Sequence, residues 1–298
     1  MKKLICDTNV FYDLGSGRLQ LVDLLGHDES LHYSPLTALE LAGKWSNESH
    51  ERRRDAAKAI LDSSATELAD PESFLTRTFG YELAEDPLSI HQGVIAMAES
   101  SNMAELEAGV ADYEARLVRR VSVDAAERWR ASTEDKWVDD ILQIMRDNIP
   151  KFDAWYDPDP ALRASNQVPK LRGQDKKAFI ESTKSNDWFL SLLLACQDRA
   201  FFKAVKDASM LPNKESVPKL LAAIDHMTCY AGVYTRYLLR VLTEGALPER
   251  NDSGDLELFI YAVDDDQVVV TGEKKWVRMC NDAGFPARVR HTAPLMKS

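Results

Sequence analysis

The chain has 298 residues, of which 45% are hydrophobic and 29% are charged. This length and composition suit a folded globular protein with two ordinary domains, or with one domain that carries a large insertion. The formal net charge of −11 argues against a general nucleic-acid binder, which needs a net basic face to displace phosphate counterions. This net charge does not exclude a local basic groove.

The cysteines and the hydropathy exclude two further classes of protein. No Cys-x-x-Cys pair occurs and no histidine stands nearby at zinc spacing, so we expect reduced, mostly buried thiols rather than a zinc site. The chain has no apolar run of about 18 residues, and an aspartate at position 7 comes too early for the core of a signal peptide. We therefore expect a cytoplasmic protein that does not associate with a membrane. The four thiols belong to Cys6, Cys196, Cys229 and Cys280.

The first predicted strand, residues 4–11, contains an acid, a hydroxyl and an amide side chain in succession, at Asp7, Thr8 and Asn9. Open α/β sheets bind ligands beyond the carboxyl ends of their strands, so an apolar start that presents Asp7 there marks it as a candidate site residue. The alternative is that Asp7-Thr8-Asn9 only caps the next helix, because all three residue types are good N-caps and turn formers.

A second acid follows a second strand. Residues 31–34 are a short strand candidate, and Ser34 is a plausible N-cap for a helix with Pro35 at its first position. This arrangement places Glu40 in the second turn of that helix. Glu40 can face the same crevice as Asp7, or it can be an ordinary solvated side chain.

Residues 47–245 have an almost entirely helical pattern, with few glycines and no convincing alternating run. Tryptophans and leucines recur there at helical spacing, which favours a helical-bundle core over a cofactor site. Interspersed acids make most basic residues an ordinary solvated face, but the run 163–177 has the best claim to bind phosphate. The candidate phosphate-binding residues are Arg163, Lys170, Arg172, Lys176 and Lys177.

The last segment returns to α/β character. Asp255 precedes an apolar helix over residues 256–262, and residues 267–271 are the clearest strand in the chain. That strand delivers Glu273 just beyond its carboxyl end. The three aspartates at 264–266 stand at the opposite end of the strand, so we expect them to form a solvated turn.

Four acids thus occupy equivalent places at strand ends and helix starts: Asp7, Glu40, Asp255 and Glu273. If they converge, they cannot all stay ionised without compensation, because like charges raise one another's pKa. A hard divalent cation such as Mg²⁺ or Mn²⁺ resolves this conflict, and it can activate water and neutralise charge on a phosphodiester. No Ser-His-Asp order, Gly-rich phosphate loop or nucleophilic cysteine competes as a chemical site.

These segments resemble PIN domains, metal-dependent nucleases with a Rossmann-like parallel sheet that include many bacterial toxin ribonucleases. Residues 7–11 resemble the opening motif of that family, and residues 35–41 resemble the segment with its second acid. Residues 255–262 and 268–273 resemble the closing part, in which an acid that opens a helix precedes a strand ending in Thr-x-Asp. The resemblance covers roughly the first 45 residues and the last 50.

The resemblance implies that Asp7, Glu40 and Asp255 are metal ligands. Asn9 and Thr271 would then orient the carboxylates as partners of the ligands.

Two positions depart from the family pattern. Glu273 stands where the family usually has Asp, and its extra methylene can shift a ligand. Asp252 can substitute for Asp255 as the third acid, although only Asp255 directly precedes the apolar residues of the helix.

The sequence therefore predicts an α/β fold in which residues 1–46 and 246–298 form a PIN-like, Rossmann-type parallel sheet. Residues 47–245 are then a large all-α insertion, which must bury its own core. Such an insertion can be a lid over the acids, a substrate clamp or a docking surface for a partner protein.

Our leading hypothesis is a Mg²⁺/Mn²⁺-dependent endoribonuclease, toxin-like, whose four acids hold one or two ions that activate water for in-line attack. RNA is implied only by the family resemblance, since no residue identifies a 2′-hydroxyl. The alternative is a PIN-like scaffold with reduced catalysis that binds a partner or regulates through its helical region. The acidic charge, the Glu at the fourth position and the size of the insertion favour that alternative. For a symmetric oligomer, an isologous dimer is the default.

Overall fold

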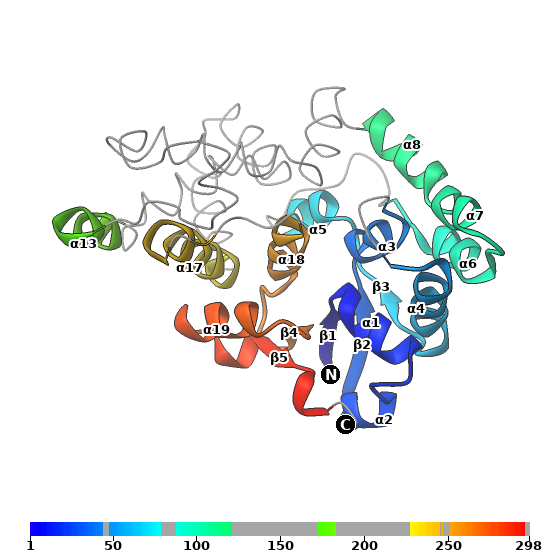
Figure 1. Ribbon diagram of the computed structural model, residues 1–298, viewed down its shortest axis with the longest axis horizontal. Coiled ribbons are helices and arrows are strands. Elements are labelled where there is room, and N and C mark those ends of the chain that lie inside the picture. Colours follow the sequence, from blue (N-terminus) through cyan, green and yellow to red (C-terminus); the bar gives the residue numbers. More distant parts are fainter. Residues whose placement is uncertain are drawn as a thin grey trace.

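The computed structural model describes residues 1–43, 48–78, 88–120, 172–182, 227–244, 246 and 251–295. At its centre is a five-stranded sheet in the order β3-β2-β1-β4-β5, in which every pair of neighbours is parallel (Figure 1). The α/β class predicted from the sequence is confirmed. The strands are β1 (Lys2–Cys6), β2 (Glu29–Tyr33), β3 (Thr66–Glu67), β4 (Gln267–Thr271) and β5 (Val289–His291).

Helices cover both faces of this sheet. In Figure 1, α1, α4 and α6 gather on one side of the strands and α17 and α19 on the other. The described α-helices are α1 (Thr8–Gly15), α2 (Leu21–Leu24), α3 (Pro35–Ala42), α4 (His50–Asp62), α5 (Pro71–Thr78), α6 (His91–Glu99), α7 (Met103–Ala108), α8 (Ala111–Arg120), α13 (Gly173–Ser182), α17 (Thr228–Glu244), α18 (Asp252–Glu257) and α19 (Lys274–Asp282). The described 3₁₀ helices are η1 (Leu258–Tyr261), η2 (Pro286–Arg288) and η3 (Ala293–Leu295).

The strand order explains this two-sided cover. The chain steps from β1 to β2 in one direction across the sheet and from β4 to β5 in the other direction. Because parallel crossovers are right-handed, the connecting helices α1 and α19 fall on opposite faces. The central strands are then buried on both faces, and they are accordingly continuous apolar runs such as Val268-Val269-Val270.

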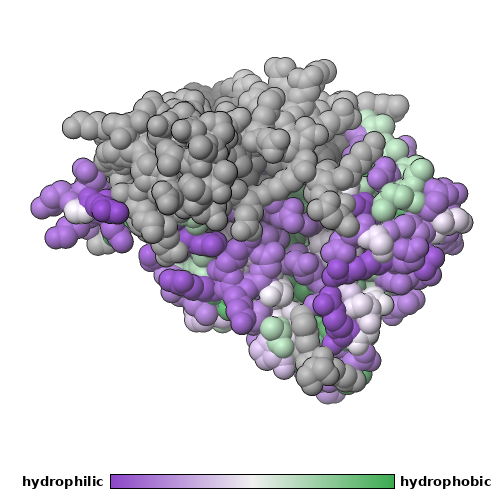
Figure 2. Space-filling model, in the orientation of Figure 1, coloured by the Kyte–Doolittle hydropathy of each residue, from purple (hydrophilic) through white to green (hydrophobic). Residues whose placement is uncertain are grey.

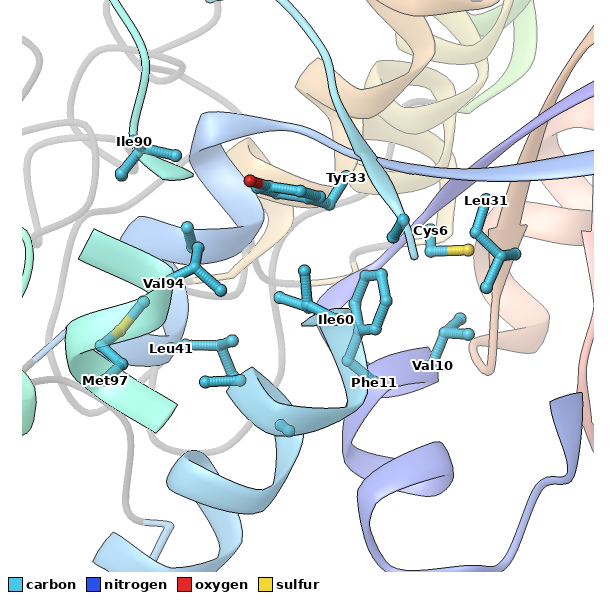
Figure 3. Packing of buried hydrophobic residues seen from close by; sticks show 14 of the residues in the cluster. Cys6, Val10, Phe11, Leu31, Tyr33, Leu41, Ile60, Ile90, Val94 and Met97 are labelled. Carbon is cyan, nitrogen blue, oxygen red and sulfur yellow. The ribbon is translucent and has the colours of Figure 1, made fainter. Parts of the chain in front are cut away.

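One core lies between the sheet and α1, α4 and α6. Figure 3 shows Phe11 of α1 beside Ile60 of α4, with Val10 and Leu31 close to Cys6 at the end of β1. Phe11, Val10 and Ile60 are all fully buried, and each such side chain contributes roughly 1.5–3 kcal/mol of hydrophobic stabilisation.

A second core covers the other face. Tyr230, Tyr234 and Tyr237 recur along one side of α17, and consecutive rings meet edge to face at 6.0 and 6.4 Å between centroids. Tyr237 stacks on Trp276 of α19 at 5.8 Å, and Trp276 contacts Phe259 of η1 at 6.3 Å. This aromatic layer connects α17 to the segment that follows it in sequence.

The α/β unit extends further along the chain than the sequence predicts. Strand β3 pairs with β2 at His32 and Thr66, inside the segment expected to be an all-helical insertion from residue 47. Val94 and Tyr113 belong to the same core as β1. The expected boundary after residue 46 therefore does not separate two packing units, and a strand of two residues is too short to show an alternating pattern. Much of the predicted insertion, including residues 121–171 and 183–226, lies outside the described residues.

The surface of the described part is mostly hydrophilic on the face shown in Figure 2. Among the described residues, the large hydrophobic side chains that are exposed are Met1 and Val22. The described helices include none that is both long enough and apolar enough to cross a membrane.

Candidate functional site

The carboxyl ends of β1 and β4 lie side by side at the point where the strand order reverses. Cys6 of β1 pairs with Val270 of β4, and the next backbone amide, that of Asp7, donates to Val270 O at 3.0 Å. Such a switch point is where open α/β sheets bind ligands, because the connections on its two sides leave in opposite directions and open a crevice. The structure therefore places Asp7 at the position expected of a site residue.

Asp7 caps the next helix and also lies at the switch point of the sheet. Strand β1 ends at Cys6, earlier than predicted, and Asp7 is the N-cap of α1, with Oδ1 accepting the Asn9 amide at 3.4 Å. Oδ2 accepts the Asn9 side-chain amide at 3.4 Å and the Thr271 hydroxyl at 2.9 Å. The carboxylate is buried beneath these donors, at 1% exposure. Asn9 and Thr271 thus both donate hydrogen bonds to this carboxylate.

Glu40 turns toward the start of α1. Ser34 caps α3 as predicted by accepting the amide of Thr37 at 3.2 Å, and the Thr37 hydroxyl donates to the Cys6 carbonyl at 3.2 Å. These contacts fix the start of α3 against the end of β1. The Thr8 hydroxyl then donates to Glu40 Oε2 at 2.5 Å. Glu40 is therefore half-buried and bonded to Thr8, and it is not an ordinary solvated residue.

The third acid is also buried, and the structure separates its two candidates. Helix α18 begins at Asp252, four residues before the predicted start at residue 256, so both aspartates lie in its first turn. Asp255 accepts a hydrogen bond from the Trp276 indole at 2.9 Å. Asp252 accepts the Tyr237 hydroxyl at 2.8 Å and forms an ion pair with Lys275 at 2.7 Å. The two acids therefore have different partners.

Glu273 is the N-cap residue of α19, directly after β4. Its backbone amide donates to the Thr271 hydroxyl oxygen at 3.1 Å, and that hydroxyl donates in turn to Asp7. Its side chain pairs with the Lys275 ammonium at 3.0 Å. The fourth acid is therefore already paired with a cation of the chain.

Three of the four acids have a raised pKa, and the charges of neighbouring acids contribute to each rise. Burial raises the pKa of Asp7 to about 6, against the Thr271 hydrogen bond that lowers it, and the charge of Glu273 raises it further. Burial, and then the charge of Asp7, raise the pKa of Glu40 to about 7. Burial raises the pKa of Asp255 well above its usual value, and repulsion by the other three acids adds to this. Like charges therefore meet in a site that water does not fully screen.

The donor chemistry of this site fits a hard divalent cation. All four acids offer carboxylate oxygens, which Mg²⁺ and Mn²⁺ prefer. Glu40 Oε1 and Asp255 Oδ1 accept no hydrogen bond from a described residue, whereas the other oxygen of each is oriented by Thr8 or Trp276. As the side chains stand, no three His, Cys, Asp or Glu residues in the described ranges are arranged to hold an ion. The carboxylates would have to move closer together to bind a metal ion.

Of the predicted phosphate-binding residues, the three that the structure describes are not brought to the acids. Arg172, Lys176 and Lys177 are exposed at and near the start of α13, which Figure 1 shows beyond α17 at the edge of the molecule. Arg163 and Lys170 lie outside the described residues.

The sequence interpretation missed the partners that orient the acids: Thr8, Tyr237, Lys275 and Trp276. The strongest available signal was Lys275, a cation two residues after the predicted site acid Glu273, with which it pairs. Trp276 instead contacts Asp255, which lies 21 residues away in sequence. Nothing in the spacing pointed to Tyr237, which lies on a distant helix.

The remaining chemical predictions concern the thiols and the aspartate run. Cys6, Cys229 and Cys280 are buried free thiols, and Cys196 lies outside the described residues. The run 264–266 forms the turn before β4, at its amino end, as predicted.

Comparison of the chain with protein-family models, with curated proteins and with solved structures found no match.

Proposed function

We propose that the protein is a Mg²⁺- or Mn²⁺-dependent endoribonuclease that hydrolyses phosphodiester bonds. One observation carries the proposal: Asp7, Glu40 and Asp255 gather at the switch point of a parallel sheet, where burial raises the pKa of each. The charge of Glu273 raises all three pKa values further, and the charge of Asp7 adds to those of Glu40 and Asp255. Acids with strongly shifted pKa values in a crevice are candidates for a functional site. A purely structural role does not require three mutually repelling carboxylates.

The resemblance to PIN domains supports the identity of the scaffold and the choice of RNA. The parallel sheet and the order of the acids along the chain are those that the resemblance implies. Asp7 and Glu273 follow strands closely, Asp255 lies in the first turn of α18, and Glu40 lies in the second turn of α3. In this proposal the described PIN-like unit includes β3 and the helices α4 to α8. The predicted helical region after α8 would carry the substrate clamp, the lid or the partner-binding surface.

Each side chain has a defined task in this proposal. Bound Mg²⁺ or Mn²⁺ would supply positive charge that lowers the pKa of a water and neutralises the phosphodiester. Asp7, Glu40 and Asp255 would hold the ion, with Glu273 as the fourth acid of the site. Thr271 and Asn9 orient Asp7, Thr8 orients Glu40, and Trp276 orients Asp255. These partners would hold the carboxylates in place against their repulsion.

A second candidate function is a PIN-like scaffold with reduced catalysis that binds a protein partner. Two observations favour it: Glu273 is paired with Lys275, and the described acids are not arranged as a ready-made ion site. Conversion of Glu273 to Asp separates the two functions, because an active site would respond to a changed fourth acid and a degenerate one would not gain cleavage.

The test of the nuclease is cleavage of single-stranded RNA, structured RNA and single-stranded DNA with Mn²⁺, Mg²⁺ or EDTA. Wild type is compared with Asp7→Asn and with a matched control, Asp23→Asn, which changes an exposed aspartate on α2. We expect metal-dependent cleavage of RNA that Asp7→Asn loses and Asp23→Asn keeps. Equal background in all three proteins, with no Mn²⁺ binding by calorimetry, would reject catalysis and leave the partner-binding function.

A further inference from the structure

The ammonium group of Lys275 is enclosed beside the acids of the candidate site. The Nζ atom of Lys275 lies 2.7 Å from Asp252 and 3.0 Å from Glu273, and 5.2 Å from the centre of the Trp276 ring. Only 16% of the Lys275 side chain is exposed. Lysine side chains usually extend their charged end into water, so this position needs a specific cause.

The location of Lys275 in its helix makes the enclosure more informative. It lies in the first turn of α19, where the positive end of the helix dipole disfavours a cation. The compensation comes from Asp252, Glu273 and the indole face, because carboxylates and aromatic rings both attract an ammonium group. Asp252 is itself fixed, since the Tyr237 hydroxyl holds its second oxygen at 2.8 Å.

This enclosure divides the acids of the crevice into two groups. Asp252 and Glu273 bind the ammonium, whereas Asp7, Glu40 and Asp255 are oriented by neutral donors. The extra methylene that distinguishes Glu from Asp lengthens the reach of Glu273 toward the ammonium. The charge of Lys275 also lowers the pKa of Asp255, so the cation acts on the same site as the acids.

We propose that Lys275 is a resident cation that stands in for a second metal ion, so that the site takes one divalent ion. Asp7, Glu40 and Asp255 hold that ion, and Asp252 and Glu273 remain paired with the Lys275 ammonium group. Lys275 is thus a positioning residue, because it withholds two carboxylates from metal binding. This inference rests on the proposed function and adds to it the number of ions in the site.

The test is the stoichiometry of Mn²⁺ binding, measured by calorimetry on the whole chain. We expect one ion per chain in wild type and in Lys275→Arg, which keeps the charge. We expect two ions per chain in Lys275→Met, which keeps the length of the side chain but releases Asp252 and Glu273. Two ions in wild type, or one ion in a folded Lys275→Met, would overturn the inference and leave the nuclease intact. No binding by wild type would reject the proposed function itself.

A second measurement needs no variant. Acetylation of surface amines, followed by mass spectrometry with and without saturating Mn²⁺, compares Lys275 with its exposed neighbour Lys274. We expect Lys274 to be acetylated in both conditions and Lys275 to remain protected in both. Acetylation of Lys275 that rises to the level of Lys274 when Mn²⁺ binds would show that the metal displaces the ammonium, and would overturn the inference.

Discussion

The Thr271 hydroxyl, at the end of β4, donates a hydrogen bond of 2.9 Å to Asp7, directly after β1. The two residues are 264 positions apart in sequence. The same hydroxyl accepts the backbone amide of Glu273 at 3.1 Å. One side chain thus aligns the ends of two adjacent strands and connects the first acid of the crevice with the fourth. It also lowers the pKa of Asp7 against the effect of burial.

Replacement of Thr271 by Val removes this hydroxyl and keeps the shape of the side chain. We expect the pKa of Asp7 to rise above its value of about 6, and the protein to lose about 1–3 kcal/mol of stability at pH 8, where the unsatisfied carboxylate is ionised. Urea denaturation at pH 8 and pH 5 measures the difference, which should be smaller at pH 5. Thr271→Ser is the control, because it retains the donor. Equal losses in the two variants would show that the methyl group matters more than the hydrogen bond.

The raised pKa values predict how the metal-free protein responds to pH. Asp7 has a pKa of about 6 in the folded state and 3.8 ordinarily, so the folded state binds more protons between these values. The free energy of unfolding is therefore highest at the acidic end of this pH range. It falls as the pH rises through the pKa of the folded state, by roughly 3 kcal/mol for Asp7 alone. Glu40, with a pKa of about 7, extends the fall toward neutral pH.

Thermal unfolding in EDTA from pH 5 to pH 8 checks this prediction. We expect the midpoint to fall over that range, and Mn²⁺ to raise it more at pH 8 than at pH 5, because the ion competes with protons for the same carboxylates. A midpoint that rises steadily with pH in EDTA would contradict the burial of these acids.

Trp276→Phe tests the orientation of Asp255. The change removes the indole donor, whose hydrogen bond to Asp255 is 2.9 Å long, and keeps an aromatic ring against Tyr237. We expect Mn²⁺ affinity to fall by about 10–100-fold, as is usual when a partner of a metal ligand is lost. Tyr237→Phe is the matched control, since its hydroxyl binds Asp252 instead. If the two variants weaken Mn²⁺ binding equally, the orientation of Asp255 is not the cause.

Two glycines should respond in opposite directions to replacement by alanine. A Cβ at Gly15, where α1 ends against α4, would lie 2.5 Å from the carbonyl oxygen of Asp55. Because backbone cannot move aside, we expect Gly15→Ala to destabilise the fold by about 1–3 kcal/mol. A Cβ at Gly254 in α18 meets no described atom within 4 Å, so Gly254→Ala should stabilise by roughly 0.5–1 kcal/mol. Denaturation midpoints of the two variants that shift in the same direction would contradict this packing.

The sequence predicts the parts of the fold that rest on local signals. The valine run of β4 and the Ser34-Pro35 start of α3 were recognisable because strand propensity and helix capping act within a few residues. The place of Asp7 at the switch point followed from the rule for parallel sheets.

The parts that failed depend on contacts between distant segments. Strand β3 has two residues and pairs only because α4 brings it beside β2, so no local pattern marks it. The partners of Asp252 are Lys275 and Tyr237, which contact that aspartate from two other helices. The identity of these partners is a property of the packed structure and not of any short motif.

The central position of β1 has a consequence for how the chain is made. Its neighbour on one side, β2, is synthesised soon afterwards, but its neighbour on the other side, β4, begins only at residue 267. A growing chain therefore carries β1 with one edge unpaired for most of its synthesis, and such an edge can pair with another chain. Because contacts of this sequence separation form slowly, we expect the sheet and its crevice to be completed only after the ribosome has passed β4.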